Sequence, residues 1–367
     1  METKEAVKNN LVKLASAGQS PWYDNIDRRL IKDGSLKSLF DSGFLGVTSN
    51  PTIFEKAVSS SGEYDPWIKK LAEEGKNALQ IYNELTMKDI REAADLLRKT
   101  YEQSSHVDGY VSIEVLPEFA HDAVRTVESA RQIFKLIDRP NIMIKVPGTK
   151  EGPDAVRELI KKGINVNVTL LFSVGHYEAC ARAYIAGLKE ALKTGKNIKN
   201  IFSVASVFVS RIDSTIDKLF EGTENGHLKG KIAVANSKMI YQKFKELFYD
   251  RDFEGLKKKG ANVQRVLWAS TSTKNPAYRD VKYVEELIGP DTINTMPPAT
   301  VDAFLDHGKV EQTLEKGLAE EKSFLKTLKA TGVSIDKVCQ EIQDKGVAAF
   351  QESFDKLIKS ITAKTKQ

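Results

Sequence analysis

Lys145 stands at the end of a short apolar stretch, Asn-Ile-Met-Ile-Lys-Val-Pro-Gly-Thr, residues 141–149. We expect residues 142–144 to form a buried strand and Val-Pro-Gly-Thr to form the turn that ends it. Burial disfavours the charged form of a lysine, and a neutral amine is a nucleophile that can form a Schiff base with a carbonyl group. The same pattern also fits an edge-strand lysine or one half of a buried ion pair, so Lys145 alone does not decide between structure and chemistry.

Polar residues recur near the carboxyl ends of the other predicted strands, mostly at alternate positions that place their side chains on one face. Burying polar groups from so many strands is costly without a purpose, and active sites form at the carboxyl ends of barrel strands. We therefore favour an active site over a set of tolerated structural polar groups. These residues are Asp24, Asn50, Ser112, Glu114, Asn165, Asn167, Thr169 and Ser206, with Phe208 at the end of the strand that carries Ser206.

The residue types fit the chemistry of an imine-forming lysine. Formation and dehydration of a carbinolamine need proton transfers, which Glu114 can relay through a water molecule held by the hydroxyl group of Thr169. Breaking a carbon–carbon bond β to the imine needs a base for the departing hydroxyl proton, and Asp24 is a second carboxylate. Neutral groups that both donate and accept hydrogen bonds suit sugar hydroxyls. They are Asn50, Asn167 and Ser206.

A phosphate site is indicated after the sixth and seventh predicted strands. Arg211 lies three residues after Phe208, and the run Ala-Ser-Thr-Ser-Thr-Lys-Asn, residues 269–275, contains Ser270 and Lys274. Late loops of a barrel often bind phosphate, to which arginine offers two parallel donors and lysine a point charge. Arg211 also fits an ordinary ion pair at a helix start, but the serine-rich loop favours phosphate binding.

Short apolar strands alternate with amphipathic helices along the chain, which is typical of parallel β–α units. Eight such units predict a closed (β/α)8 TIM barrel, and no G-x-G-x-x-G or G-x-x-x-x-G-K-[ST] motif follows a strand. We predict strands at residues 20–26, 46–48, 110–115, 142–146, 164–170, 201–208, 263–269 and 291–294. Helices are predicted, among others, at residues 122–137, 153–161, 175–192, 229–249 and 277–287.

Two stretches lie outside this alternation. Residues 61–105 and residues 310–364 predict additional helices, and residues 334–360 form a long amphipathic one. No linker rich in Pro, Gly or Ser separates these stretches from the barrel, so we expect one domain over residues 1–367. The tail helix could cover the barrel or mediate dimerisation, and we expect a monomer or a homodimer.

Composition argues against several other classes of protein. The 367 residues are 41% hydrophobic and 29% charged with a net charge of +5, which is ordinary for a globular protein and mild for nucleic-acid binding. Two distant cysteines and five dispersed histidines have no metal-ligand spacing, so we expect no metal and no cofactor. The charged start Met-Glu-Thr-Lys-Glu and the lack of a long apolar run predict no signal peptide and no membrane helix, and therefore a cytoplasmic location.

Seven segments resemble the transaldolase family, in family order, over roughly residues 20–300. Each segment alone is a weak signal, but together they are highly specific, and the additional helices are similar to those of the longer bacterial subfamily. The segments are Trp-Tyr-Asp-Asn (22–25), Gly-Val-Thr-Ser-Asn-Pro-Thr-Ile-Phe (46–54), Ser-Ile-Glu-Val (112–115), Ile-Met-Ile-Lys-Val-Pro-Gly-Thr (142–149), Asn-Val-Thr-Leu-Leu-Phe-Ser (167–173), Ala-Ser-Val-Phe-Val-Ser-Arg-Ile-Asp (205–213) and Leu-Trp-Ala-Ser-Thr (267–271).

The resemblance implies a class I aldolase-type barrel of the non-oxidative pentose phosphate pathway. Such an enzyme transfers a dihydroxyacetone unit from sedoheptulose 7-phosphate or fructose 6-phosphate to an aldose phosphate, glyceraldehyde 3-phosphate or erythrose 4-phosphate. By position, Lys145 matches the Schiff-base lysine and Asp24 the acid/base at the carbon–carbon bond. The other matches are Glu114 and Thr169 for the catalytic water, Asn50, Asn167 and Ser206 for substrate hydroxyls, and Arg211 for phosphate.

Two positions depart from the family pattern, and rival functions stay open. Lys274 stands where shorter members have a second phosphate arginine, and Asn25 replaces one Asp of the subfamily's usual pair. The related fructose 6-phosphate aldolases share the lysine but release free dihydroxyacetone. They have glutamine at the Glu114 position and tyrosine at the Phe208 position, so this chain favours transfer. A barrel that binds sugar phosphates without covalent chemistry is a further alternative.

Overall fold

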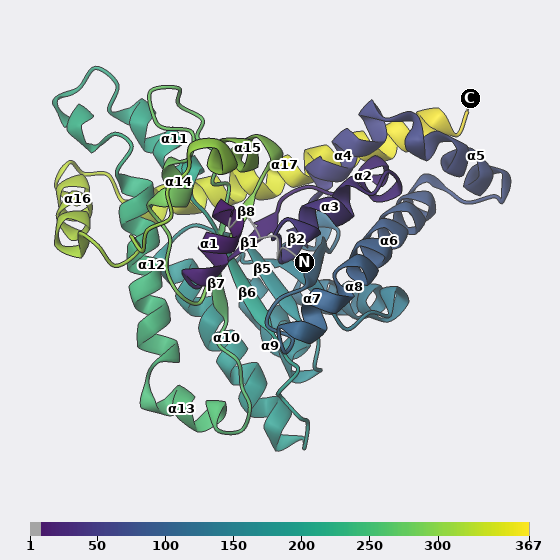
Figure 1. Ribbon diagram of the computed structural model, residues 1–367, viewed down its shortest axis with the longest axis horizontal. Coiled ribbons are helices and arrows are strands. Elements are labelled where there is room, and N and C mark those ends of the chain that lie inside the picture. Colours follow the sequence, from purple (N-terminus) through teal and green to yellow (C-terminus); the bar gives the residue numbers. More distant parts are fainter. Residues whose placement is uncertain (1–8, 367) are drawn as a thin grey trace, which may run out of the picture.

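The structure, a computed structural model, describes residues 9–366 and is a closed barrel of eight parallel strands (Figure 1). Each strand pairs with its neighbours in chain order, and β1 closes the barrel by pairing with β8. This topology confirms the predicted (β/α)8 fold. The charged segment at residues 1–5 lies outside the described residues. The strands are β1 (Gln19–Tyr23), β2 (Gly46–Thr48), β3 (Tyr110–Glu114), β4 (Ile142–Pro147), β5 (Val166–Leu171), β6 (Ser203–Phe208), β7 (Arg265–Ala269) and β8 (Thr292–Met296).

Helices surround the barrel and form its outer layer (Figure 1). The first eight are α1 (Asn10–Ser16), α2 (Arg28–Lys32), α3 (Ser35–Asp41), α4 (Pro51–Ser60), α5 (Asp65–Glu73), α6 (Ala78–Leu96), α7 (Arg98–Gln103) and α8 (Ala123–Ile137). The next nine are α9 (Gly152–Lys161), α10 (Val174–Lys193), α11 (Ser210–Leu219), α12 (Ile232–Phe248), α13 (Arg251–Lys257), α14 (Lys282–Glu285), α15 (Pro298–His307), α16 (Leu318–Ala330) and α17 (Ile335–Lys364). Short 3-10 turns lie at η1 (Gly62–Tyr64), η2 (Pro117–Phe119) and η3 (Glu224–Leu228).

The predicted strands lie at the right places, but several predicted ranges are longer than the paired segments. The first was predicted to reach residue 26, whereas β1 ends at Tyr23 and places Asp24 in the loop above the barrel. Ile26 and Ile201 are buried although neither belongs to a strand. A run of apolar residues indicates that a segment is buried, but it does not show where the hydrogen bonds between neighbouring strands end.

The helix predicted at residues 277–287 is wrong for most of its length. Only α14 is helical, and the residues before it form a loop of turns and bends. Contacts outside the segment hold this loop, because the Tyr278 hydroxyl donates to Asp217 Oδ2 at 2.6 Å and Thr273 Oγ1 donates to the Arg279 carbonyl at 2.9 Å. Such tertiary bonds override the local helical pattern.

The two additional stretches contain helices as predicted, but they are placed differently from one another. In the first stretch, α6 packs against β3 and α8 and so serves as the barrel's own covering helix. In the second, the long helix α17 runs beside α4 and α5 and continues across the top of the barrel (Figure 1). Gln343 of α17 fixes this crossing, because its Nε2 donates to the carbonyls of Gly148 and Leu170 at 2.8 and 2.9 Å.

Polar side chains close the amino-terminal end of the barrel. Arg265 donates to Asp108 Oδ1 at 2.9 Å and to Ser20 Oγ at 2.8 Å, and Trp22 Nε1 also donates to Asp108 at 3.2 Å. Asn165, one of the predicted inward-facing residues, belongs to this end, where its amide accepts from the Phe202 backbone N–H at 2.9 Å. Asn165 is therefore structural, and the carboxyl ends of the strands are left to form a site.

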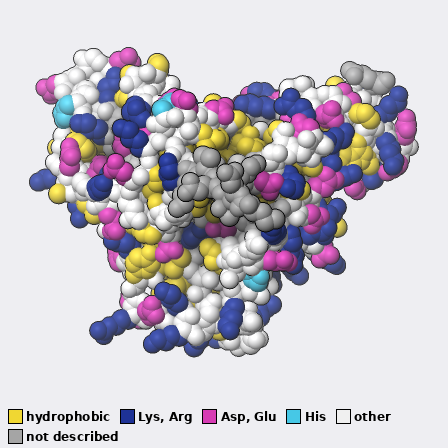
Figure 2. Space-filling model, viewed as in Figure 1, with side chains coloured by type: hydrophobic (Ala, Val, Ile, Leu, Met, Phe, Trp, Pro, Cys, Tyr) yellow, Lys and Arg dark blue, Asp and Glu magenta, His cyan; other side chains and the backbone are white. Residues whose placement is uncertain are grey.

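The surface is mixed in charge. On the face in Figure 2, lysine and arginine side chains are interspersed with aspartate and glutamate, as is typical of a solvated protein surface. Within residues 9–366, no helix combines the length and the apolar character that crossing a membrane requires.

Candidate active site

A cavity of about 510 Å³ opens at the carboxyl ends of the strands, under the crossing of α17. Most of the residues predicted from the sequence line it, although they come from loops and strands far apart in the chain. Glu114 and Asn167 do not line it and lie just behind the lining residues. The predicted residues at the wall are Asp24, Asn50, Lys145, Thr169, Ser206, Phe208, Arg211, Ser270 and Lys274.

Lys145 is held between neighbouring strands at the floor of this cavity. The register places Glu114 of β3 and Asn167 of β5 on either side of it. Its side chain is only 5% exposed, and Nζ donates to the Ser49 carbonyl at 2.9 Å and lies 3.5 Å from Glu114 Oε2. A buried amine with a carboxylate beside it, open to a cavity, is the arrangement that imine chemistry needs.

Both carboxylates at the floor resist ionisation. Burial raises the pKa of Glu114, and the neighbouring Lys145 partly opposes this shift. Burial also raises the pKa of Asp24, against the hydrogen bond from Thr48 and the charge of Lys145. That hydrogen bond, from Thr48 Oγ1 to Asp24 Oδ1, is 2.5 Å long. Two carboxyl groups with raised pKa beside one lysine are suited to proton transfer.

Two buried oxygens beside Lys145 have unused hydrogen-bonding capacity. Glu114 Oε2 and Thr169 Oγ1 are buried, and neither has a hydrogen-bond partner within residues 9–366. Buried polar atoms are normally satisfied by protein or by ordered water. This pair therefore fits the water-holding role predicted for Glu114 and Thr169.

Asn167 is oriented by its neighbours. Ser206 Oγ donates to its Oδ1 at 2.6 Å, and its Nδ2 donates to Ser112 Oγ at 3.1 Å. The amide therefore supports Ser206, which lines the cavity, and lies one step further from it than the sequence prediction assumed. Asn50 does line the cavity, although its side-chain oxygen is already engaged as the N-cap of α4, where it accepts from the Ile53 N–H at 3.0 Å.

The phosphate-site residues lie at the outer part of the cavity. Arg211 lies in the first turn of α11, with its guanidinium carbon 5.3 Å from the centre of the Phe208 ring. Lys274 Nζ donates to Ser272 Oγ at 2.6 Å, and Ser270 Oγ lies 3.0 Å from Ser210 Oγ. Within residues 9–366, neither cation has a carboxylate oxygen within 4.0 Å. Burial lowers the pKa of Arg211 and of Lys274, and Arg211 and Lys56 add to the effect on Lys274.

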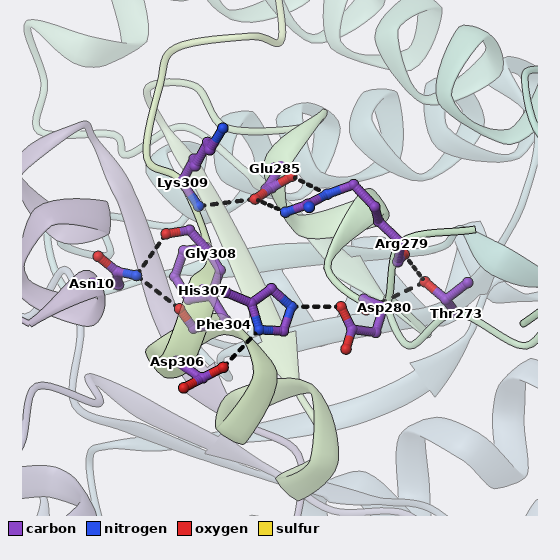
Figure 3. Close-up of polar contacts among 10 residues, drawn as sticks. All are labelled: Asn10, Thr273, Arg279, Asp280, Glu285, Phe304, Asp306, His307, Gly308 and Lys309. Carbon is purple, nitrogen blue, oxygen red and sulfur yellow. Dashed lines mark hydrogen bonds and ion pairs between the residues drawn. The ribbon is translucent and has the colours of Figure 1, made fainter. Parts of the chain in front are cut away.

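The loop that carries Lys274 is tied to the rest of the molecule at its far end (Figure 3). Asp280 Oδ1 lies 2.8 Å from His307 Nε2, and Asp306 Oδ2 lies 3.0 Å from His307 Nδ1. These two carboxylates raise the pKa of His307. Arg279 donates to Glu285 Oε1 at 3.0 Å, so the loop is joined to α14 and α15.

Sequence reasoning missed several residues of the wall. Thr48 holds Asp24, Lys56 projects from α4, and Phe350 comes from α17. Thr48 could have been found, because it alternates with Asn50 at the end of a predicted strand. Lys56 and Phe350 carry no local signal, because only the folded positions of α4 and α17 bring them to the cavity. Within residues 9–366, no group of acidic, histidine or cysteine side chains could hold a metal ion.

Comparison with known proteins identifies the family of the chain. The chain matches the family described as transaldolase/fructose-6-phosphate aldolase over residues 21–361. A protein named transaldolase 2 from Nostoc sp. is 46% identical over 373 residues, covering 98% of each chain. A transaldolase from Trichodesmium erythraeum is 44% identical, covering 98% of this chain and 99% of its own. One from Saccharopolyspora erythraea is 44% identical, covering 96% and 97%. The chain belongs to the transaldolase/fructose-6-phosphate aldolase family.

Proposed function

We propose that this protein is a transaldolase of the non-oxidative pentose phosphate pathway. It transfers a dihydroxyacetone unit from fructose 6-phosphate or sedoheptulose 7-phosphate to erythrose 4-phosphate or glyceraldehyde 3-phosphate. The observation that supports this most is Lys145, a buried lysine 3.5 Å from Glu114 at the floor of a cavity whose outer part carries Arg211 and Lys274. Family membership and near full-length similarity to proteins named transaldolase agree with it.

The first half of the proposed reaction forms an imine. The neutral amine of Lys145 attacks the ketone carbon of the donor sugar, and the carbinolamine loses its hydroxyl group as water. Glu114, through a water molecule held by Thr169, moves the protons that these steps require. Ser206, backed by Asn167, and Asn50 are placed to bind the sugar hydroxyls.

Asp24 serves the bond-breaking step. Its carboxylate takes the proton from the hydroxyl group next to the scissile bond, the carbon–carbon bond breaks, and the aldose phosphate leaves. The electron pair of that bond passes to the imine, so an enamine of dihydroxyacetone stays on Lys145. The aldehyde of the acceptor is then attacked by this enamine, Asp24 returns the proton, and hydrolysis of the new imine releases the product and the amine.

Two residues favour transfer over release of free dihydroxyacetone. Phe208 lies at the wall of the cavity, 8% exposed, and offers no hydroxyl group that could protonate the enamine. Glu114 is a carboxylate where the aldolases have an amide. Without a proton donor at this point, the enamine persists until an acceptor aldehyde arrives.

The proposal is tested by incubating the protein with fructose 6-phosphate and erythrose 4-phosphate and analysing the products. A transaldolase forms sedoheptulose 7-phosphate and glyceraldehyde 3-phosphate with little free dihydroxyacetone. Free dihydroxyacetone without sedoheptulose 7-phosphate would identify an aldolase instead. Binding of fructose 6-phosphate with neither product would identify a non-covalent sugar-phosphate barrel.

We also propose that residues 1–367 form one domain, which functions as a monomer or a homodimer in the cytoplasm. The packing of α17 against α4, α6 and the top of the barrel supports a single domain. Cys180 and Cys339 are both free buried thiols, which fits a reducing compartment.

A further inference from the structure

Lys56 is a cation at the cavity wall for which the proposed mechanism has no role. It lies on α4, the helix that follows β2, whereas Arg211 and Lys274 follow β6 and β7. Strands β2 and β6 lie on opposite sides of an eight-stranded barrel, so Lys56 reaches the cavity from the side opposite Arg211. Three cations from three separate elements therefore converge on one opening.

Lys56 has no partner that would explain its position. Within residues 9–366, its ammonium makes no hydrogen bond and has no carboxylate oxygen within 4.0 Å. Within residues 9–366, other exposed lysines such as Lys69 are unpaired as well, but Lys69 does not line the cavity, whereas Lys56 does. An unpaired lysine beside two further cations is repelled by them unless an anion is bound between the three.

The charges around the cavity are divided between its two ends. The carboxylates Asp24 and Glu114 lie at the floor with Lys145, while at the outer part the charges of Arg211 and Lys56 both act on Lys274. Asp27 also lines the cavity, but its side chain caps α2 by accepting from the Arg29 N–H at 2.7 Å. A phosphate monoester carries about −1.5 to −2 charges at pH 7. The positive charge of three cations is therefore enough to neutralise one phosphate group.

The backbone that carries Lys56 is held firmly in place. Asn50 caps the helix, and Phe54 and Ala57 are buried beneath it. Thr52 Oγ1 lies 2.8 Å from Ser353 Oγ of α17, which joins the helix to the tail. The Lys56 side chain is exposed, and its flexible stem can follow a charged group.

We propose that Lys56 is a third phosphate-binding residue, which holds the phosphate group of the donor and acceptor sugars together with Lys274 and from the side opposite Arg211. The inference rests on the proposed transaldolase function and deepens it. Lysine at position 274 offers a point charge where arginine would offer a two-pronged donor, and Lys56 supplies the additional charge.

The test is the variant Lys56→Gln, with Lys69→Gln as the matched control. Lys69 is an exposed lysine on α5 that does not line the cavity, so the two variants change the net charge equally. For Lys56→Gln, we expect KM for fructose 6-phosphate and the inhibition constant of inorganic phosphate to rise roughly tenfold, with a smaller change in kcat. Lys56→Arg should restore both constants, and Lys69→Gln should leave them unchanged.

Unchanged KM and phosphate inhibition in Lys56→Gln would overturn the inference, as would equal changes in Lys69→Gln. The failure of the proposed function has a different signature, because unmodified protein would then form no sedoheptulose 7-phosphate at all. Thermal unfolding of each variant shows whether a change in KM comes from the lost charge or from a damaged fold.

Discussion

At the residue scale, the proposed mechanism makes Phe208 the residue that protects the enamine from protonation. The variant Phe208→Tyr places a hydroxyl group at the cavity wall, where it can protonate the enamine and release dihydroxyacetone before an acceptor arrives. We expect free dihydroxyacetone from fructose 6-phosphate to rise about tenfold or more while transfer to erythrose 4-phosphate falls. An enzymatic assay for free dihydroxyacetone measures this. No increase in release would contradict the role given to Phe208.

The raised pKa of Asp24 predicts the acid side of the pH profile. Asp24 must be ionised to accept a proton, so activity falls as the pH drops through its pKa, and burial moves that fall to a higher pH than for an exposed aspartate. Thr48→Val removes a hydrogen bond that lowers the pKa, so the fall in kcat should begin roughly one pH unit higher.

Thr271→Val is the control for the pH experiment. Thr271 is also buried near the carboxyl ends of the strands, but it donates to Asn294 Oδ1 at 3.0 Å and not to a carboxylate. The acid limb of this variant should stay in place. Equal shifts in both variants would show that the effect comes from general damage to the barrel.

Sequence reasoning reached most of the residues at strand ends, and Arg211 just after one, but missed Lys56 and Phe350 within helices. Lys145, Thr169 and Ser206 could be predicted to share one wall, because a strand presents alternate side chains to one face. The sequence could not show that the Asn167 amide is hydrogen-bonded to Ser206 and Ser112, since a hydrogen bond between neighbouring strands depends on the side-chain rotamers. Lys56 has no periodic signal that separates it from other surface lysines.

At the element scale, one of the contacts that hold the loop before α14, and with it Lys274, is made by the partly buried Tyr278. Tyr278 donates to Asp217 Oδ2 at 2.6 Å, and its ring lies against Gly230, where an added Cβ would come within 2.7 Å. We expect Tyr278→Phe to loosen the loop, so that KM for fructose 6-phosphate rises about threefold to tenfold with little change in kcat.

Tyr249→Phe is the matched control for the loop. Tyr249 also donates to an aspartate, Asp291 Oδ2 at 2.7 Å, but it lies outside the cavity wall. Steady-state kinetics of both variants give the comparison. If kcat of Tyr278→Phe falls by the same factor as its KM rises, the contact does not act through phosphate binding. The same conclusion follows if KM rises equally in Tyr249→Phe.

The same loop shows why the predicted helix at residues 277–287 was wrong. Periodicity within the segment is compatible with a helix, but Thr273, Tyr278 and Asp280 each make contacts that hold the chain in a loop of turns and bends. Functional loops are positioned by a rigid scaffold, and their shape is set by partners distant in sequence. Local patterns do not contain that information.

At the scale of the whole molecule, the barrel could be predicted from the sequence, but the position of α17 across its top could not. Eight apolar strands that alternate with helices leave few alternatives to a (β/α)8 barrel, because parallel strands need helical crossovers. The course of α17 depends on contacts such as Gln343 with the carbonyls of Gly148 and Leu170, which join residues more than 170 positions apart. The sequence predicted the long tail helix but left open whether it covers the barrel.

The central claim is that Lys145 forms an imine with the donor sugar, and borohydride trapping tests it most directly. After incubation with fructose 6-phosphate and borohydride, peptide mass spectrometry should find a reduced three-carbon unit on Lys145. Lys238, another buried lysine, is paired with Glu321 at 2.7 Å away from the cavity and should stay unmodified. No adduct, or an adduct that persists in Lys145→Ala, would contradict the account.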